Sequence, residues 1–268
     1  VSIAHCPERV LPGQVIQELV ENDRVIGGIT PKCAELTRDL YRIFVNGECI
    51  ITDSRTAELS KLAENAFRDV NIAFANELSI ISDKLGINVW ELIKLANRHP
   101  RVNIFQPGPG VGGHCIAVDP WFIFNSAPNE AKLIHMARLV NDNKPQFVLK
   151  QIDLAKKAIK KKKKEINIAC LGLSFKPNID DLRESPALYI AFQVSKMAFS
   201  RFYIVEPNIK KIPKEFDQNL LKLVSIEEAI KKADILVLLV DHDEFKGINQ
   251  NSLLDKQVID TRGIFIQA

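Results

Sequence analysis

Apolar residues recur at helical spacing over one long central stretch of the chain. From residue 54 to residue 85 they fall three or four positions apart, and the pattern stops at Gly86. This spacing predicts one helix of about 30 residues, capped at its start by Ser54 or Thr56, with a second helix beginning near Asn88. A helix of that length far exceeds the globular average of about 11 or 12 residues. It is therefore expected to connect domains or to form the spine of a dimer.

Short apolar runs alternate with helical patterns before this stretch. Thr30-Pro31 has the form of a helix cap followed by a proline in the first turn, which predicts a helix that runs to about residue 44. A turn is expected at Pro12-Gly13. Strands are expected at residues 2–5, 24–27 and 48–52. Strands separated by a helix indicate α/β architecture.

The same alternation returns after the central stretch. A loop rich in proline and glycine is expected over residues 100–120, followed by helix to about Lys164. The five lysines at positions 160–164 are interpreted as a solvated helix end. Further strands are expected at residues 166–171, 201–205, 235–240 and 258–259, with helices at 187–198 and 226–232. This order predicts a doubly wound parallel sheet, which binds ligands at the carboxyl ends of its strands.

Composition narrows the class of protein. The chain has 268 residues, of which 46% are hydrophobic and 26% charged, and its net charge is +3. So small a charge gives no reason to expect a nucleic-acid partner, although it suits an anionic substrate. Neither a membrane span nor a signal peptide is apparent, which predicts a cytoplasmic protein. Five cysteines without paired spacing are expected to be reduced thiols, and no spacing of Cys or His predicts a metal site.

Cys115 is the strongest candidate for chemistry. It follows glycines at positions 108, 110, 112 and 113, and Asp119 comes four residues later. Glycines allow a backbone to approach a ligand and expose N–H groups to anions. A cysteine beyond such a loop can act as a nucleophile, and Asp119 can orient a water molecule. The alternative is a buried structural cysteine after a flexible turn.

Polar side chains on the long helix form a second candidate group. Lys61 and Asn65 are four residues apart and share one helix face, where an ammonium and an amide can stabilise an oxyanion. Glu8 follows a predicted strand, where α/β sites are built. Taken alone, Lys61 and Asn65 are more typical of a solvated polar stripe, and Glu8 is more typical of a surface carboxylate.

Basic residues follow the predicted strands of the C-terminal part. Lys176 and Arg183 lie between a strand and a helix, a place that suits phosphate binding, and Arg262 follows the last predicted strand. A loop with paired Asp and Arg charges is the alternative. The chain lacks a G-x-G-x-x-G fingerprint between a predicted strand and a helix, which is the context that dinucleotide binding requires.

In this order the motifs resemble the UDP-glucose/GDP-mannose dehydrogenase family along the whole chain. The stretches that carry the resemblance are Cys6 to Arg9, the helix with Lys61, Asn65, Asn76 and Glu77, Gly112 to Cys115, Phe175 to Pro177 with Arg183 to Ser185, and Asp260 to Gly263. The resemblance implies three parts. They are the end of an N-terminal Rossmann domain that binds NAD (residues 1–53), a helical central domain that dimerises (54–145) and a Rossmann-like domain that binds UDP (146–268).

The resemblance also implies roles for single residues. Cys115 is the expected nucleophile, with Lys61, Asn65 and Asp119 as the other catalytic residues. Arg183 is expected to approach NAD. Residues expected to bind the UDP-sugar are Glu8, Arg101, Gly112, Phe175, Lys176 and Arg262. Arg101 is expected to act in the other subunit of a homodimer.

Three stretches are most similar to the family members that oxidise UDP-N-acetyl-D-mannosamine at C6: residues 6–13, 108–121 and 176–186. UDP-glucose enzymes carry Ser in place of His114, and a second glutamate where this chain has Pro12. The expected reaction is a four-electron oxidation to the uronate through a cysteine thiohemiacetal and thioester. UDP-N-acetylglucosamine or another UDP-HexNAc is an alternative substrate, and a non-catalytic nucleotide-sugar-binding or dimerisation module is an alternative function. Because the chain starts as if within a strand, it is expected to be a fragment. The resemblance implies that this fragment lacks most of the NAD-binding domain, so it is expected to be inactive by itself.

Overall fold

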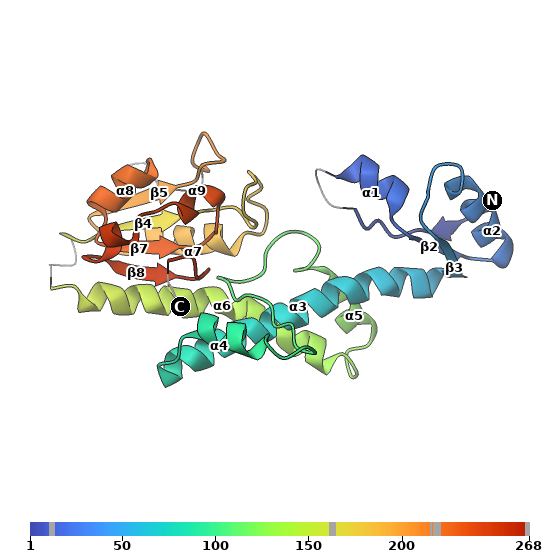
Figure 1. Cartoon of the computed structure of the whole chain (residues 1–268), viewed down its shortest axis with the longest axis horizontal. Coiled ribbons are helices and arrows are strands. Elements are labelled where there is room, and N and C mark those ends of the chain that lie inside the picture. The colour runs from blue at the N-terminus through green and yellow to red at the C-terminus, as the bar shows by residue number, and fades with distance from the viewer. Residues whose placement is uncertain (11–13, 161–164, 215, 217–220, 266–268) are drawn as a thin grey trace. The chain divides into compact units, whose positions relative to one another are not determined.

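The computed structural model describes residues 1–10, 14–160, 165–214, 216 and 221–265. Figure 1 labels its helices and strands. The chain divides into two compact units: Val1–Arg68 with Asp119–Lys132, and Asp69–Val118 with Leu133–Ala268. The turn expected at Pro12-Gly13 and all but the first of the lysines 160–164 lie outside the described residues.

The first unit contains a three-stranded sheet in the order β1-β2-β3. Strand β2 (Arg24–Gly28) pairs antiparallel with β1 (Ala4–His5) and parallel with β3 (Cys49–Asp53). Helix α2 (Pro31–Tyr41) begins as expected, since the side chain of Thr30 accepts a hydrogen bond from the Cys33 N–H. Helix α1 (Val15–Glu21) was not predicted, because it has neither a side-chain cap nor a buried residue.

The long central helix is confirmed. Helix α3 (Ser54–Leu85) has 32 residues and contributes to both units. The predicted cap is wrong, because the Asp53 carboxylate, rather than Ser54 or Thr56, accepts hydrogen bonds from the N–H groups of Arg55 and Thr56. Helix α4 (Val89–Ala96) starts directly after Asn88, near which it was expected to begin, and the Asn88 side chain caps it.

Two helices follow the glycine-rich loop. Helix α5 (Asp119–Ser126) begins one residue before the predicted end of the loop. Helix α6 (Lys132–Ala158) ends six residues before Lys164, the predicted limit. Within the described residues, no helix is both long and apolar enough to span a bilayer.

The C-terminal sheet is doubly wound, as predicted. Its five parallel strands lie in the order β6-β5-β4-β7-β8, so the third, second, first, fourth and fifth strands of the sheet along the chain are neighbours. The order reverses between β4 and β7, where such sheets bind ligands beyond the carboxyl ends of the strands. The strands are β4 (Asn167–Leu171), β5 (Arg201–Val205), β6 (Leu221–Leu223), β7 (Ile235–Leu238) and β8 (Gln257–Asp260).

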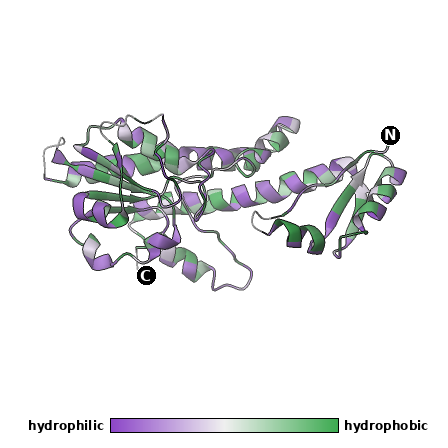
Figure 2. Ribbon diagram, turned by 90° about the horizontal axis from the view of Figure 1, so that it is seen from above, coloured by the Kyte–Doolittle hydropathy of each residue, from purple (hydrophilic) through white to green (hydrophobic). Residues whose placement is uncertain are grey.

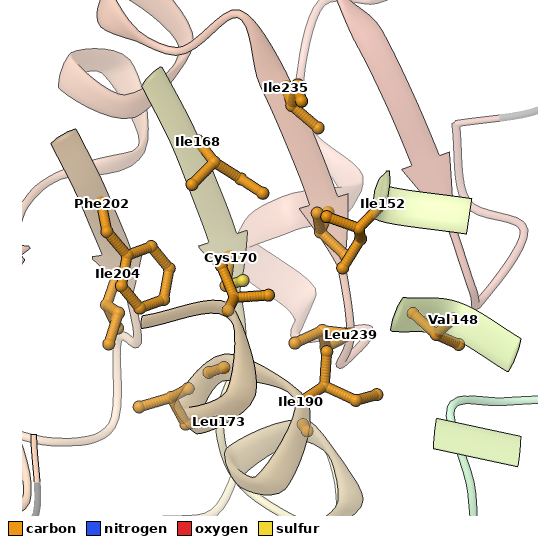
Figure 3. Packing of buried hydrophobic residues seen from close by; sticks show 14 of the residues in the cluster. Val148, Ile152, Ile168, Cys170, Leu173, Ile190, Phe202, Ile204, Ile235 and Leu239 are labelled. Carbon is orange, nitrogen blue, oxygen red and sulfur yellow. The ribbon is translucent and has the colours of Figure 1, made fainter. Parts of the chain in front are cut away.

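Both faces of this sheet are covered by helices. Val148 and Ile152 of α6 and Ile190 of α7 (Pro186–Ser195) pack on one face, as Figure 3 shows. Helices α8 (Ile226–Lys232) and α9 (Asp243–Lys246) and the 3-10 helix η2 (Gln250–Leu253) pack on the other. Strands buried on both faces are apolar without alternation, and they appear as hydrophobic ribbons in Figure 2. The three-residue strand β6, α9 and η2 are too short to have been predicted.

Candidate active site

The glycine-rich loop packs tightly against the segment that follows β4. A Cβ added to Gly112 would lie 2.5 Å from the carbonyl oxygen of Glu184 and 2.7 Å from Pro186. Gly113 has a φ of +81°, and its added Cβ would lie 3.0 Å from the ring of Phe175. Only glycine allows the backbone to pack this closely against its neighbours and, at Gly113, to adopt a positive φ without strain. The glycines therefore fix the loop directly before Cys115.

Cys115 is exposed at the end of this loop. Its Sγ lies 3.1 Å from the Nδ1 atom of His114, and its carbonyl oxygen accepts a hydrogen bond from the Val118 N–H. The pKa of Arg183 is raised by its hydrogen bonds with Asp181 and by the charge of that residue, with a smaller contribution from the charge of Cys115. Cys115 is thus accessible and lies among ionisable groups, unlike the buried structural cysteine of the alternative interpretation.

A cavity of about 620 Å³ lies beside the loop within the second unit. It brings together four of the residues expected to bind substrate, which come from the glycine-rich loop, the β4 segment and the end of β8: Gly112, Phe175, Lys176 and Arg262. Arg101, which is exposed, and Arg183 are not among its lining residues.

Arg262 is held at the cavity wall by its neighbours. Its Nε donates to the Asp241 carboxylate at 2.7 Å, and its backbone N–H donates to Asp260 at 2.9 Å. A Cβ added to Gly108 would lie 2.5 Å from the guanidinium, so the glycine-rich loop leaves room for this side chain. The guanidinium is about a quarter exposed and remains available to an anionic ligand.

A buried carboxylate orders the segment that carries Phe175 and Lys176. Glu206, directly after β5, accepts hydrogen bonds from the N–H groups of Leu173 and Ser174 at 2.7 and 3.2 Å. His242, fully buried, contacts the same carboxylate at 3.1 Å. Burial by itself would raise the pKa of Glu206. The hydrogen bonds from His242, Leu173 and Asn208 have a larger combined effect, so the pKa lies below its ordinary value. The carboxylate therefore stays ionised and fixes the turn after β4.

A second buried network holds the glycine-rich loop from the other side. Asp69 of α3 pairs with Arg138 of α6 at 2.6 Å and accepts from Asn141 at 2.8 Å. Asn141 in turn accepts from Asn76, whose Oδ1 accepts from the Gly108 N–H at 2.9 Å. The four side chains are at most 2% exposed. Burial raises the pKa of Asp69 despite its partners. Only a weak signal of this network is present in the sequence, namely two polar residues, Asp69 and Asn76, seven positions apart on α3.

The other predicted residues belong to the first unit. Asn65 is buried and donates to the Asp119 carboxylate at 2.6 Å, so two of the expected catalytic residues are in contact. Lys61 lies one helical turn earlier, 3.8 Å from Glu64.

Glu8 is positioned by a buried arginine of the first unit. Its carboxylate accepts from the Arg24 guanidinium at 3.1 Å and from the Arg9 N–H at 2.7 Å. Partial burial by itself would raise the pKa of Glu8. These hydrogen bonds and the charge of Arg24 have a larger combined effect, so the pKa lies below its ordinary value. Within the described residues, no group of three or more His, Cys, Asp or Glu side chains is placed to hold a metal ion.

Three family models match the chain in succession. They are the NAD binding domain (residues 1–45), the central domain (55–143) and the UDP binding domain (169–267) of the UDP-glucose/GDP-mannose dehydrogenase family. The chain belongs to this family. It has a short NAD-binding part, a helical central domain and a parallel-sheet UDP-binding domain, as the sequence resemblance implied. The exact domain boundaries stay a prediction.

Relatives of this dehydrogenase family differ in the sugar that their names specify. The chain is 58% identical to the UDP-N-acetyl-D-mannosamine dehydrogenase of Salmonella typhi over 99% of its own length and 64% of that protein. It is 59% identical to an NDP-N-acetyl-D-galactosaminuronic acid dehydrogenase of Ralstonia nicotianae, over 99% of its length and 61% of the relative. The solved UDP-D-ManNAc dehydrogenase of Pyrococcus horikoshii matches with a TM-score of 0.87 and 39% identity, covering the whole chain and 62% of that structure. The chain thus spans less than two thirds of these relatives.

The close contact at Gly112 gives a test of the loop geometry. We expect Gly112→Ala to cost about 1–3 kcal/mol of unfolding free energy, because the added methyl group must displace the Glu184 carbonyl or Pro186. Hydrogen exchange at the amides of residues 108–115 should also accelerate. Gly247→Ala is the matched control, since its Cβ meets no atom within 4 Å. Equal behaviour of the two variants would contradict the proposed packing.

The lowered pKa of Glu206 predicts a pH dependence. Its contribution to stability is complete above the ordinary value of 4.5 and is lost as the pH falls through the lower folded pKa. We expect Glu206→Gln to lose about 1–3 kcal/mol at pH 7, and the difference from wild type to shrink below pH 4.5. Denaturant unfolding at several pH values measures this. Glu244→Gln, at an exposed carboxylate, is the control, and a difference for Glu206→Gln that does not vary with pH would refute the assignment.

Proposed function

We propose that the protein, together with a complete NAD-binding domain, oxidises the C6 alcohol of UDP-N-acetyl-D-mannosamine to the carboxylate by removing four electrons. The observation that carries the proposal is the position of Cys115. It is exposed at the end of a loop that also lines a cavity with Lys176 and Arg262. A nucleophile beside a cavity with two cationic side chains suits a substrate that is both anionic and electrophilic after its first oxidation.

Cys115 carries the covalent step of the proposed reaction. The first oxidation converts the alcohol to an aldehyde, which the sulfur attacks to form a thiohemiacetal. The second oxidation yields a thioester, and water hydrolyses it to the acid. Lys61 and Asn65 stabilise the oxyanions, and Asp119 with Lys61 directs the water. The 2.6 Å bond between Asn65 and Asp119 supports a shared role for these two residues.

The C-terminal domain is suited to UDP rather than to a dinucleotide. In dinucleotide-binding domains an acidic residue near the end of the second strand binds a ribose hydroxyl. Glu206 has this place after β5, but its carboxylate is occupied by the N–H groups of Leu173 and Ser174. Lys176 and Arg262 bind the diphosphate and Phe175 lies beside it. By resemblance, Gly112 and Glu8 are each assigned to binding the sugar, and Arg101 is assigned to the substrate of the other subunit.

NAD, when bound, accepts a hydride in each oxidation. Most of its binding site is not provided by this chain. Its one match to the G-x-G-x-x-G pattern, Gly108 to Gly113, lies in the loop before Cys115 and does not join a strand to a helix. Of the residues present, Arg183 fits a role toward NAD. Its side chain is 65% exposed, and Asp181 occupies its Nε and one Nη, leaving the other Nη without a hydrogen-bond partner among the described residues.

The sugar is assigned by resemblance. The similar identities to relatives named for mannosamine and galactosamine derivatives support an N-acetylhexosamine as the substrate class. UDP-N-acetylglucosamine or another UDP-HexNAc is the alternative within that class. An alternative from another class is a nucleotide-sugar-binding or dimerisation module without catalysis.

The homodimer and the cytoplasmic location stay predictions. A dimer is supported by the apolar residues that α3 exposes within the second unit. Phe74, Ile81 and Leu85 are 51%, 45% and 64% exposed, and they recur at spacings of seven and four on one helix face. Such a stripe needs a covering surface.

NADH formation by the full-length protein tests the proposed function. We expect two NADH per UDP-N-acetyl-D-mannosamine for the wild type and a loss of at least 10³-fold in rate, roughly the cost of removing a nucleophile, for Cys115→Ser. Cys49→Ser, at a half-buried cysteine outside the site, is the control and should retain the wild-type rate.

Other results distinguish the alternatives. A higher kcat/KM with UDP-N-acetylglucosamine or UDP-N-acetylgalactosamine in the same assay would reassign the sugar. One NADH per sugar would exclude oxidation to the acid. UDP binding without NADH formation from any UDP-sugar would favour the binding module.

A further inference from the structure

His114 touches the sulfur that the proposed function makes the nucleophile. Its Nδ1 atom lies 3.1 Å from the Sγ of Cys115, within reach of a hydrogen bond. Both side chains are exposed, so a small electrophile can reach the sulfur while the contact persists. The loop conformation that brings the residues to this point is fixed by Gly113, which has a φ of +81° and lies against Phe175.

Two further charged groups face this pair. Asp181 and Arg183 form an ion pair at 2.5 Å in the segment after β4. The pKa of Asp181 is lowered to about 2, mainly by its hydrogen bonds with Arg183, and the charge of His114 contributes a small part. The charge of Cys115 contributes to the raised pKa of Arg183. The ion pair between Asp181 and Arg183 therefore lies near both His114 and Cys115.

Only one of these neighbours can take a proton from the thiol near neutral pH. The Arg183 guanidinium remains protonated and has no acceptor atom. Asp181, with a pKa of about 2, is too weak a base. An imidazole titrates in the neutral range and is the common general base of cysteine nucleophiles.

We propose that His114 is a catalytic residue that accepts the thiol proton of Cys115 as the sulfur attacks the sugar aldehyde. The S–H bond breaks and its proton moves to Nδ1. The sulfur electron pair forms the S–C bond, and the carbonyl π electrons move to oxygen. Return of the proton from the imidazolium to this oxygen completes the thiohemiacetal. The step is redox-neutral, and it rests on the proposed function for the identity of the electrophile.

Alkylation of Cys115 by iodoacetamide tests this without sugar or NAD. We compare wild-type protein with His114→Asn, which keeps a polar side chain but no base, by following the mass of the peptide that contains Cys115. At pH 7 the variant should react about tenfold more slowly, because it has no base in contact with the thiol to accept the proton as the sulfur attacks. At pH 9.5, where hydroxide removes the proton, the two rates should agree within about twofold.

The design separates a proton acceptor from a structural residue. His5→Asn, at an exposed histidine of the first unit, is the control and should match wild type at both pH values. Equal rates for wild type and His114→Asn at pH 7, or an equal decrease at both pH values, would overturn the proposal. The assay needs no turnover. Failure to oxidise any UDP-sugar would therefore disprove the proposed function, whereas the alkylation rates alone decide whether His114 accepts the thiol proton.

Discussion

The hydrogen bond from the Gly108 N–H to Asn76 is the contact on which the candidate site depends most. It ties the start of the glycine-rich loop to the middle of α3, and the chain Asn76–Asn141–Asp69–Arg138 ties α3 to α6. Asp69 Oδ2 and Arg138 Nε are buried without hydrogen-bond partners among the described residues, so the network is not optimised for stability. The network instead holds α3 and α6 in register and fixes the start of the glycine-rich loop at Gly108.

The opposite side of the site is fixed by a different buried charge. Glu206 turns its carboxylate back to the N–H groups after β4, and in a dinucleotide-binding domain a carboxylate near this place would face a ribose. The ring of Phe175 packs against Gly113, and Lys176 lines the cavity. In this domain the acidic residue after the second strand of the sheet therefore bonds to the protein itself.

The sequence was sufficient to predict the main architecture. The long apolar periodicity predicted α3, and the strand–helix alternation predicted the doubly wound sheet, since burial on both faces leaves uninterrupted apolar strands. It failed where local signals were weak, as at α1, β6, α9 and the cap of α3. The site was predicted only in part: glycine spacing singled out Cys115 and its loop. The buried bonds of Asn76, Arg138 and Glu206 depend on contacts between residues more than 30 positions apart, which a pattern along the chain does not reveal.

Mass spectrometry of the full-length protein during turnover can detect the proposed covalent intermediate. When the reaction with UDP-N-acetyl-D-mannosamine and NAD is quenched with acid, we expect a sugar-nucleotide adduct on the peptide containing Cys115. The adduct should be absent when NAD is omitted and absent from Cys115→Ser. An Asp119→Asn variant should hydrolyse the thioester more slowly and so accumulate this adduct. Turnover of that variant without an adduct on Cys115, or an adduct on another cysteine, would contradict the assignment of Cys115 as the nucleophile.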